Sequence, residues 1–176
     1  MLGTSMPLRM PGRRLRYLGL AVLTGLALFV LPLLAPPVQA GALDYEPDLE
    51  AQLFTLMNQQ RATQGLPPLQ EHWLLQQVAR IRSWDMANRR YFSHYSPETL
   101  SAFDMFNGLG LSGRTTGENI GYNYLDSSGS AREMIRMFMA SPPHAAQILS
   151  RRFRYAGIGE VTNSAGARYY TMLFSD

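Results

Sequence analysis

The spacing of apolar residues changes along this chain of 176 residues, and this change restricts the possible folds more than any other feature. From Asp48 onward the apolar residues recur every three or four positions, which is typical of one helical face: Leu49, Leu53, Leu56 and Met57. Near the C-terminus, in "YAGIGEV" and "RYYTMLF", adjacent residues suit opposite faces of strands, and the turn cluster "TNSAG" separates the two segments. Helices followed by a terminal hairpin predict an α+β fold rather than βαβ repeats.

Further elements are expected between these two ends. A second helix is predicted from about Glu71 to Arg90. Ser130 is expected to be the N-cap of a helix over "SAREMIRMFMA", with Glu133 at the capping-box spacing. Shorter helices are predicted in "LSAFDMFNGLGL" and "SPPHAAQIL", and a short strand in "GENIGYNY". These elements describe an α+β sandwich.

The first forty residues have the pattern of a targeting segment. Arginines precede an uncharged apolar run from Tyr17 to Leu34, and prolines and small residues follow it up to Ala40. This order predicts a secretory signal peptide over residues 1–40, cleaved after Ala40, and a secreted, periplasmic or cell-envelope protein. The alternative is an uncleaved membrane anchor over residues 17–35, because the run approaches the ~20 residues that cross a bilayer. A short lead-in over residues 41–50 and one domain over residues 51–176 are expected to follow.

The charge balance argues against a nucleic-acid partner. Four of the 16 basic residues lie in the leader, which leaves 12 basic and 13 acidic residues and a net charge of −1. Binding to a phosphate backbone requires a cluster of positive charge, and the domain has only short pairs of arginines. The chain has no cysteine, but a domain of this length can bury a sufficient core without disulfides. Any membrane contact is expected through the N-terminal segment alone.

The chain contains three histidines, and two of them lie in segments rich in serine and proline. These segments are "FSHYSP", with His94, and "SPPHAAQIL", with His144. A carboxylate, Glu118, lies between a glycine and an asparagine in "GENIG". The separations between these residues match no local zinc motif, such as two ligands one helical turn apart. The residue pattern alone therefore describes an exported α+β domain and does not define a site.

Seven motifs follow one another along the chain: "LMNQQRATQGLPPL", "LLQQVARIRSWDM", "YFSHYSP", "GENIG", "FMASPPHAAQIL", "YAGIGEV" and "YYTMLF". Together they resemble the motifs of the CAP superfamily, which comprises cysteine-rich secretory, antigen-five and pathogenesis-related proteins and has a large bacterial branch. The resemblance extends from about Leu53 to Phe174. It implies an α-β-α sandwich in which helices cover a small mixed or antiparallel sheet, with a histidine–glutamate groove at its centre.

The resemblance also implies which residues form the groove. The two groove histidines of the family fall on His94 and His144, and the glutamate of its Gly-Glu-Asn motif falls on Glu118. The position of a second glutamate in eukaryotic members is Ser141 here, as is common in bacterial members. Phe138 occupies a position that is usually tryptophan. The groove set is therefore reduced to His94, Glu118 and His144, with Ser141 beside them.

Two interpretations of this set remain open. Two neutral imidazoles with a carboxylate or water could complete a tetrahedral zinc site with an open position. Alternatively, the three side chains form a metal-free polar cluster that fixes the sheet to its covering helices. Gly117 and Gly121 have no Cβ and are expected to let other backbone approach Glu118 closely. Three further polar residues of the motifs are expected to bond backbone groups as part of the scaffold: Asn58, Arg61 and Asn119.

Three functions follow as hypotheses. The first is a binding module whose groove holds zinc or a small apolar or polar ligand of the extracellular space or envelope. Four tyrosines are expected around that groove: Tyr91, Tyr95, Tyr122 and Tyr124. The second is a metal-dependent hydrolase, in which zinc activates water and Glu118 is the general base. The third is a structural envelope protein held by the uncleaved leader.

Overall fold

The computed structural model describes residues 45–110 and 116–176, so the predicted signal peptide and residues 41–44 of the lead-in lie outside the described residues. The helices are α1 (Pro47–Thr63), α2 (Trp73–Arg89), α3 (Ala102–Gly108), α4 (Ser130–Ala140) and α5 (Pro142–Ile148). The strands are β1 (Gln70–Glu71), β2 (Thr116–Asn123), β3 (Tyr155–Thr162) and β4 (Arg168–Ser175). Within these two ranges, none of the helices combines the length and the apolar composition that a membrane crossing requires.

The strands form one mixed sheet in the order β1-β3-β4-β2. The C-terminal hairpin pairs β3 with β4, β2 runs antiparallel to β4, and the two residues of β1 run parallel to β3. β2 therefore lies at an edge of the sheet, although it precedes the hairpin in sequence. Glu118 of β2 is opposite Leu173, and Tyr122 is opposite Tyr169.

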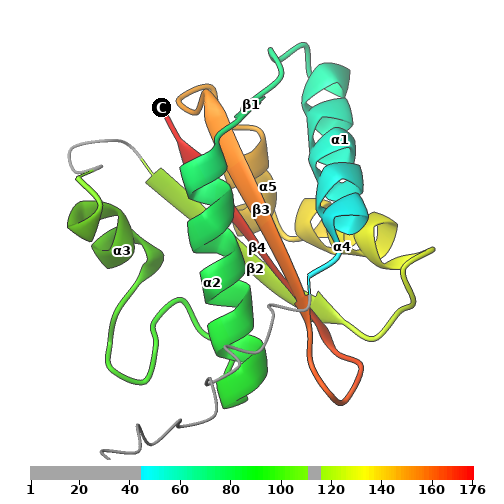
Figure 1. Cartoon of the computed structure of the whole chain (residues 1–176). Coiled ribbons are helices and arrows are strands. Elements are labelled where there is room, and N and C mark those ends of the chain that lie inside the picture. The colour runs from blue at the N-terminus through cyan, green and yellow to red at the C-terminus, as the bar shows by residue number, and fades with distance from the viewer. Residues whose placement is uncertain (1–44, 111–115) are drawn as a thin grey trace, which may run out of the picture. The chain divides into compact units, whose positions relative to one another are not determined.

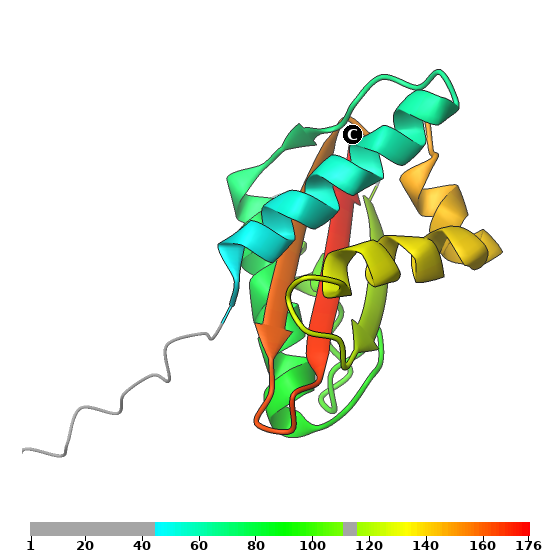
Figure 2. The ribbon, with the colours of Figure 1, turned by 90° about the vertical axis from the view of Figure 1, so that its right-hand side faces the viewer.

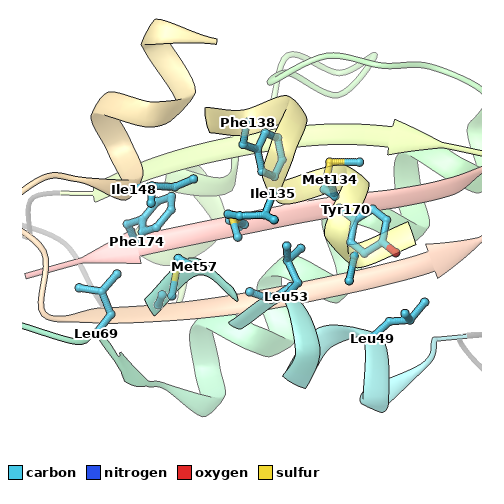
Figure 3. Packing of buried hydrophobic residues seen from close by; sticks show 14 of the residues in the cluster. Leu49, Leu53, Met57, Leu69, Met134, Ile135, Phe138, Ile148, Tyr170 and Phe174 are labelled. Carbon is cyan, nitrogen blue, oxygen red and sulfur yellow. The ribbon is translucent and has the colours of Figure 1, made fainter. Parts of the chain in front are cut away.

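Helices cover both faces of the sheet, as Figures 1 and 2 show. α2 lies across one face, whereas α1, α4 and α5 lie on the other. The larger core fills the space under α1, α4 and α5 and includes Leu53, Met57, Met134, Phe138 and Phe174 (Figure 3). Leu173, which precedes Phe174 on β4, faces the opposite side of the sheet and packs in a second cluster with α2 and α3. This alternation on β4 confirms the predicted α+β sandwich.

α2 packs unusually close to β3 because two glycines of the strand face it. A Cβ built on Gly157 would lie 2.1 Å from the backbone nitrogen of Gln76. A Cβ on Gly159 would lie 2.2 Å from the backbone nitrogen of Arg80. Real Cβ atoms do not approach backbone this closely, so only glycine allows the main chain of α2 to rest on the strand.

The predicted N-cap of α4 is wrong. Ser130 is the first helical residue and Gly129 is the N-cap. The hydroxyl of Ser130 is buried and lies 2.6 Å from the Tyr170 hydroxyl, so its hydrogen bonds go to the sheet rather than to the helix terminus. Glu133 does not form a capping box either and pairs with Arg136 on the surface. A capping box does occur at the start of α3, where Ser101 and Asp104 bond to each other's backbone.

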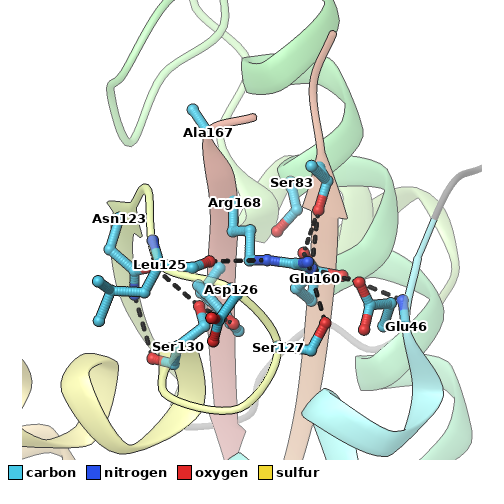
Figure 4. Close-up of polar contacts among 12 residues, drawn as sticks. Glu46, Ser83, Asn123, Leu125, Asp126, Ser127, Ser130, Glu160, Ala167 and Arg168 are labelled. Carbon is cyan, nitrogen blue, oxygen red and sulfur yellow. Dashed lines mark hydrogen bonds and ion pairs between the residues drawn. The ribbon is translucent and has the colours of Figure 1, made fainter. Parts of the chain in front are cut away.

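A polar network joins the start of α1 to the hairpin (Figure 4). Arg168 Nη1 donates to Glu46 Oε1 (2.5 Å) and to Glu160 Oε1 (3.2 Å), and the backbone nitrogen of Glu46 donates to Glu160 Oε2 (3.0 Å). The other nitrogens of Arg168 donate to the loop before α4, at Leu125 O and Ser127 Oγ. Burial raises the pKa of Glu160 despite these bonds. The network fixes the first residues of the domain to β3 and β4.

Candidate functional site

Glu118 lies on the edge strand β2 with only 2% of its side chain exposed. Its Oε2 lies 2.5 Å from His94 Nδ1, and its Oε1 accepts a hydrogen bond from Arg82 Nε at 3.2 Å. Arg82 is on α2 and fully buried, whereas His94 is in the loop after α2 with 51% of its side chain exposed. The predicted pairing of His94 with Glu118 is therefore made, and a buried guanidinium completes it.

Arg82 also holds the loop that carries His94. Its Nη1 donates to the Tyr91 hydroxyl (3.0 Å) and its Nη2 donates to the backbone oxygen of Ser93 (2.8 Å). The Tyr91 hydroxyl in turn donates to Asp85 on α2. Burial, together with the hydrogen bond to Asp85, raises the pKa of Tyr91 to about 12, so the phenol keeps its proton at neutral pH. The loop is thus bound to α2 at Tyr91 and Ser93, just before His94.

His144 lies on α5. Its ring packs against Phe138 of α4, with the ring centroids 5.2 Å apart, and Asn119 Nδ2 donates to its backbone oxygen (3.0 Å). Burial, followed by the nearby charge of His94, lowers the pKa of His144, so its neutral form is favoured. The predicted scaffold role of Asn119 is confirmed by this bond.

The short helix α5 is held in place by a buried arginine from α1. Arg61 Nη1 donates to Ile148 O (2.7 Å) and Ser150 O (2.9 Å), at the C-terminal end of α5. A cation at this end of a helix complements the helix dipole and satisfies carbonyls that have no partner within the helix. Asn58 exchanges hydrogen bonds with the backbone of Leu69 in the turn after α1. The predicted scaffold roles of Asn58 and Arg61 are confirmed.

Two hollows of different character lie along β2. The polar hollow has a volume of about 350 Å³ and is lined by His94, Tyr95, Ser101, Phe103, Thr116, Gly117, Glu118 and Gln147. The apolar hollow has a volume of about 420 Å³ and is lined by Phe92, Ile120, Gly121, Tyr122, Met134, Met137, Phe138, Ser141 and His144. His144 and Gln147 are one turn apart on α5, so the two hollows adjoin.

The glycines beside Glu118 leave room for side chains rather than for backbone. A Cβ on Gly117 would lie 2.3 Å from Gln147 Oε1, and one on Gly121 would lie 2.5 Å from Met134 Sδ. The expected close approach of other backbone to Glu118 is therefore wrong, because side chains of α4 and α5 cover this part of β2. Close packing of backbone against glycine occurs instead on β3, at Gly157 and Gly159.

The four tyrosines expected around the groove have different positions. Tyr95 lines the polar hollow and Tyr122 lines the apolar hollow. Tyr124 is exposed and packs edge-on against the ring of Tyr122, with the centroids 6.0 Å apart. Tyr91 lines neither hollow and supports Arg82 instead. Two of the four, Tyr95 and Tyr122, therefore line a hollow.

The structure does not assemble the three-residue zinc site, which was one of the two interpretations of the groove residues. In the part of the chain that the structure describes, no three His, Cys, Asp or Glu side chains lie close enough together to hold a metal ion. Both oxygens of Glu118 are engaged, by Arg82 and by His94, and His144 belongs to the neighbouring hollow. The donor set therefore does not fit a site in which Glu118 is a ligand.

Comparison with known proteins decides the family. The model of the family described as "CAP: Cysteine-rich secretory protein family" matches residues 54–174. The chain belongs to the CAP family. The chain has no cysteine, although the family is described as cysteine-rich.

Relatives of this CAP protein are known from bacteria. The uncharacterized protein YkwD of Bacillus subtilis (strain 168) is 36% identical over 116 residues, which cover 66% of this chain and 44% of YkwD. An extracellular SCP-domain protein from Bacillus anthracis str. Ames has a structure that matches 74% of this chain and 41% of its own, with 28% identity and a TM-score of 0.65. The chain thus spans less than half the length of each of these relatives.

The structure of NaASP2 with Zn²⁺ shares the fold. It covers 74% of this chain and 80% of NaASP2, with a TM-score of 0.55 and 11% identity. At this identity the likeness extends to the CAP fold alone.

Arg82 is the residue of this CAP site that the motifs did not single out. It follows Val78 and Ala79 and precedes Met86 at helical spacing, on the buried face of α2. An arginine on an apolar face must find a buried partner, because an unpaired charge is costly to bury. That position in "VARIRSWDM" was therefore a signal that a carboxylate from elsewhere in the chain would meet α2.

Proposed function

We propose that this CAP protein is an extracellular or cell-envelope binding protein whose groove along β2 takes a small amphipathic ligand. The apolar part of the ligand occupies the apolar hollow, and its polar group reaches His94 in the polar hollow. The observation that carries the proposal is the pair of adjoining hollows on one strand, since each is within the ~300–1,000 Å³ of small-molecule sites. The extracellular description of the Bacillus anthracis relative supports the location.

The contacts of Glu118 favour binding over hydrolysis. A general base needs a free lone pair directed at the proton that it removes. Here one carboxylate oxygen faces Arg82 and the other faces His94. The alternative of a metal-dependent hydrolase with Glu118 as base receives no support from this arrangement.

Binding of eight-carbon amphiphiles tests the proposal. Octanol is expected to bind in isothermal titration and to shift the amide NMR signals of Ile120, Tyr122 and Met137. Met137→Asp should weaken this binding about tenfold or more, because a carboxylate at the hollow must lose water when the alkyl chain enters. Met137 is 39% exposed, so the substitution should leave the fold intact.

A matched control is Ile81→Asp. Ile81 is a similarly exposed apolar residue on α2, 45% exposed, and lines neither hollow. Octanol affinity should be unchanged in this variant. Equal weakening in the two variants, or NMR shifts on a different surface, would exclude the groove as the ligand site.

Zinc binding through the two histidines is a second candidate, favoured by the state of His144. A zinc ligand must be a neutral imidazole, and the lowered pKa of His144 extends the pH range in which it is neutral. Titration with zinc chloride at neutral pH is expected to give weak binding that is lost in His94→Ala and in His144→Ala. The control His72→Ala should keep it. Zinc that binds equally well without either groove histidine ends this candidate.

A further inference from the structure

The contacts of Glu118 define the protonation of the His94 ring. A carboxylate can only accept hydrogen bonds, so the 2.5 Å contact of Oε2 with Nδ1 requires the proton to be on Nδ1. The buried guanidinium of Arg82 donates to Oε1, so the carboxylate faces a cation on one side and Nδ1 on the other. When the ring is neutral, Nε2 is therefore the unprotonated nitrogen. Among the described residues, no hydrogen-bond partner of Nε2 is found, and half of the side chain is exposed.

We propose that Arg82 is a positioning residue that acts through Glu118 to hold neutral His94 with its proton on Nδ1 and to present Nε2 as an acceptor in the polar hollow. This inference rests on the proposed function, in which the polar hollow receives the polar group of the ligand. It also specifies the chemistry of that group. The polar group should be a hydrogen-bond donor, such as a hydroxyl, and a carboxylate should be disfavoured.

The geometry of Arg82 explains why arginine is needed for this role. Its Nε faces Glu118, its Nη1 faces Tyr91 and its Nη2 faces the backbone oxygen of Ser93. Three partners therefore fix the orientation of the planar guanidinium. The guanidinium in turn fixes the position of the Glu118 carboxylate relative to Ser93, the residue before His94. The single ammonium of lysine has no such planar arrangement of donors.

The variant Glu118→Gln tests the proposal, because its amide has one accepting and one donating end. With Arg82 present, the amide oxygen should face the Nε–H of Arg82, which leaves the amide NH₂ facing His94. Nδ1 must then accept, and the proton of the neutral ring moves to Nε2. An amide that replaces the carboxylate partner of a catalytic histidine reverses the tautomer in the same way in serine proteases.

The double variant Arg82→Met/Glu118→Gln isolates the contribution of Arg82. Without the guanidinium, the amide is free to turn its oxygen toward His94, so the fraction of rings with the proton on Nδ1 should rise above that in Glu118→Gln. This variant leaves no unpaired buried charge, and it should therefore fold. A residue with a purely structural role would not change the tautomer ratio between the two variants.

The ratio is measured from the ¹⁵N chemical shifts of the ring nitrogens, recorded at a pH at which the spectra themselves show that the ring is neutral. His94→Ala assigns the signals. The proposal is overturned if the wild-type ring carries its proton on Nε2, or if the two Glu118 variants have the same ratio. These spectra need no ligand, so a failure of octanol to bind would refute the proposed function alone.

The preference for the ligand's polar group provides a second readout. Wild type should bind octanol at least about tenfold more tightly than octanoate. Nε2 of His94 and the carboxylate of octanoate are both hydrogen-bond acceptors, and neither has a proton to donate. In Glu118→Gln the protonated Nε2 can donate, so this preference should shrink or reverse. An unchanged preference in that variant would contradict the assigned role of the tautomer.

Discussion

Replacing Arg82 by methionine is expected to lower the free energy of unfolding by about 3–5 kcal/mol, the cost of leaving one member of a buried ion pair without its partner. Glu118 would remain 2% exposed with no cation beside it, and Tyr91 and Ser93 would each lose a hydrogen-bond donor. Urea denaturation followed by circular dichroism measures the change.

Two further variants show whether the loss comes from the unpaired charge. Arg82→Met/Glu118→Gln should recover a large part of the stability, because the remaining amide is neutral. Arg136→Met removes the exposed partner of Glu133 and should cost less than about 1 kcal/mol. If Arg82→Met costs no more than Arg136→Met, Arg82 and Glu118 do not form the buried pair described above.

Gly159→Ala is expected to destabilise the domain by about 3 kcal/mol, at the upper end of the usual cost of overpacking. The added Cβ would lie 2.2 Å from the nitrogen of Arg80 and 2.3 Å from the carbonyl carbon of Ala79. Both are backbone atoms, so no rotation of a side chain can relieve the contact and α2 itself must move. The expected result is a large drop in the urea midpoint, with the slope of the transition unchanged.

Gly108→Ala is the matched control for this substitution. Gly108 ends α3, and a Cβ built on it meets no atom within 4 Å. The alanine should be neutral or slightly stabilising, since it reduces the freedom of the unfolded chain. Similar losses at the two positions would mean that the contact between α2 and β3 is looser than described.

Much of the fold could be predicted from residue spacing, because long elements repeat a pattern many times. α1 and the hairpin have clear periods, and the structure confirms both. β1 has only two residues, Gln70 and Glu71, which is too short to show any period. Ser130 was misassigned because cap preferences describe exposed helix ends, whereas this hydroxyl is buried beside Tyr170.

The site was predictable only in part because its residues come from distant segments. The resemblance to the CAP family identified His94 and Glu118, which are in contact, and His144, which lines the apolar hollow. Arg82 was missed because one arginine in a helix does not reveal which carboxylate will face it. Whether His94, Glu118, Ser141 and His144 bind a ligand stays a prediction.

The two sides of the groove differ in how firmly they are held. On one side α2 carries Arg82, and its main chain already touches β3 at Gly157 and Gly159. On the other side α5 has only seven residues and is held by side-chain hydrogen bonds from Arg61 and Asn119. If the groove takes a ligand as proposed, a larger ligand should displace α5 rather than α2, because side-chain hydrogen bonds and not main-chain packing hold α5.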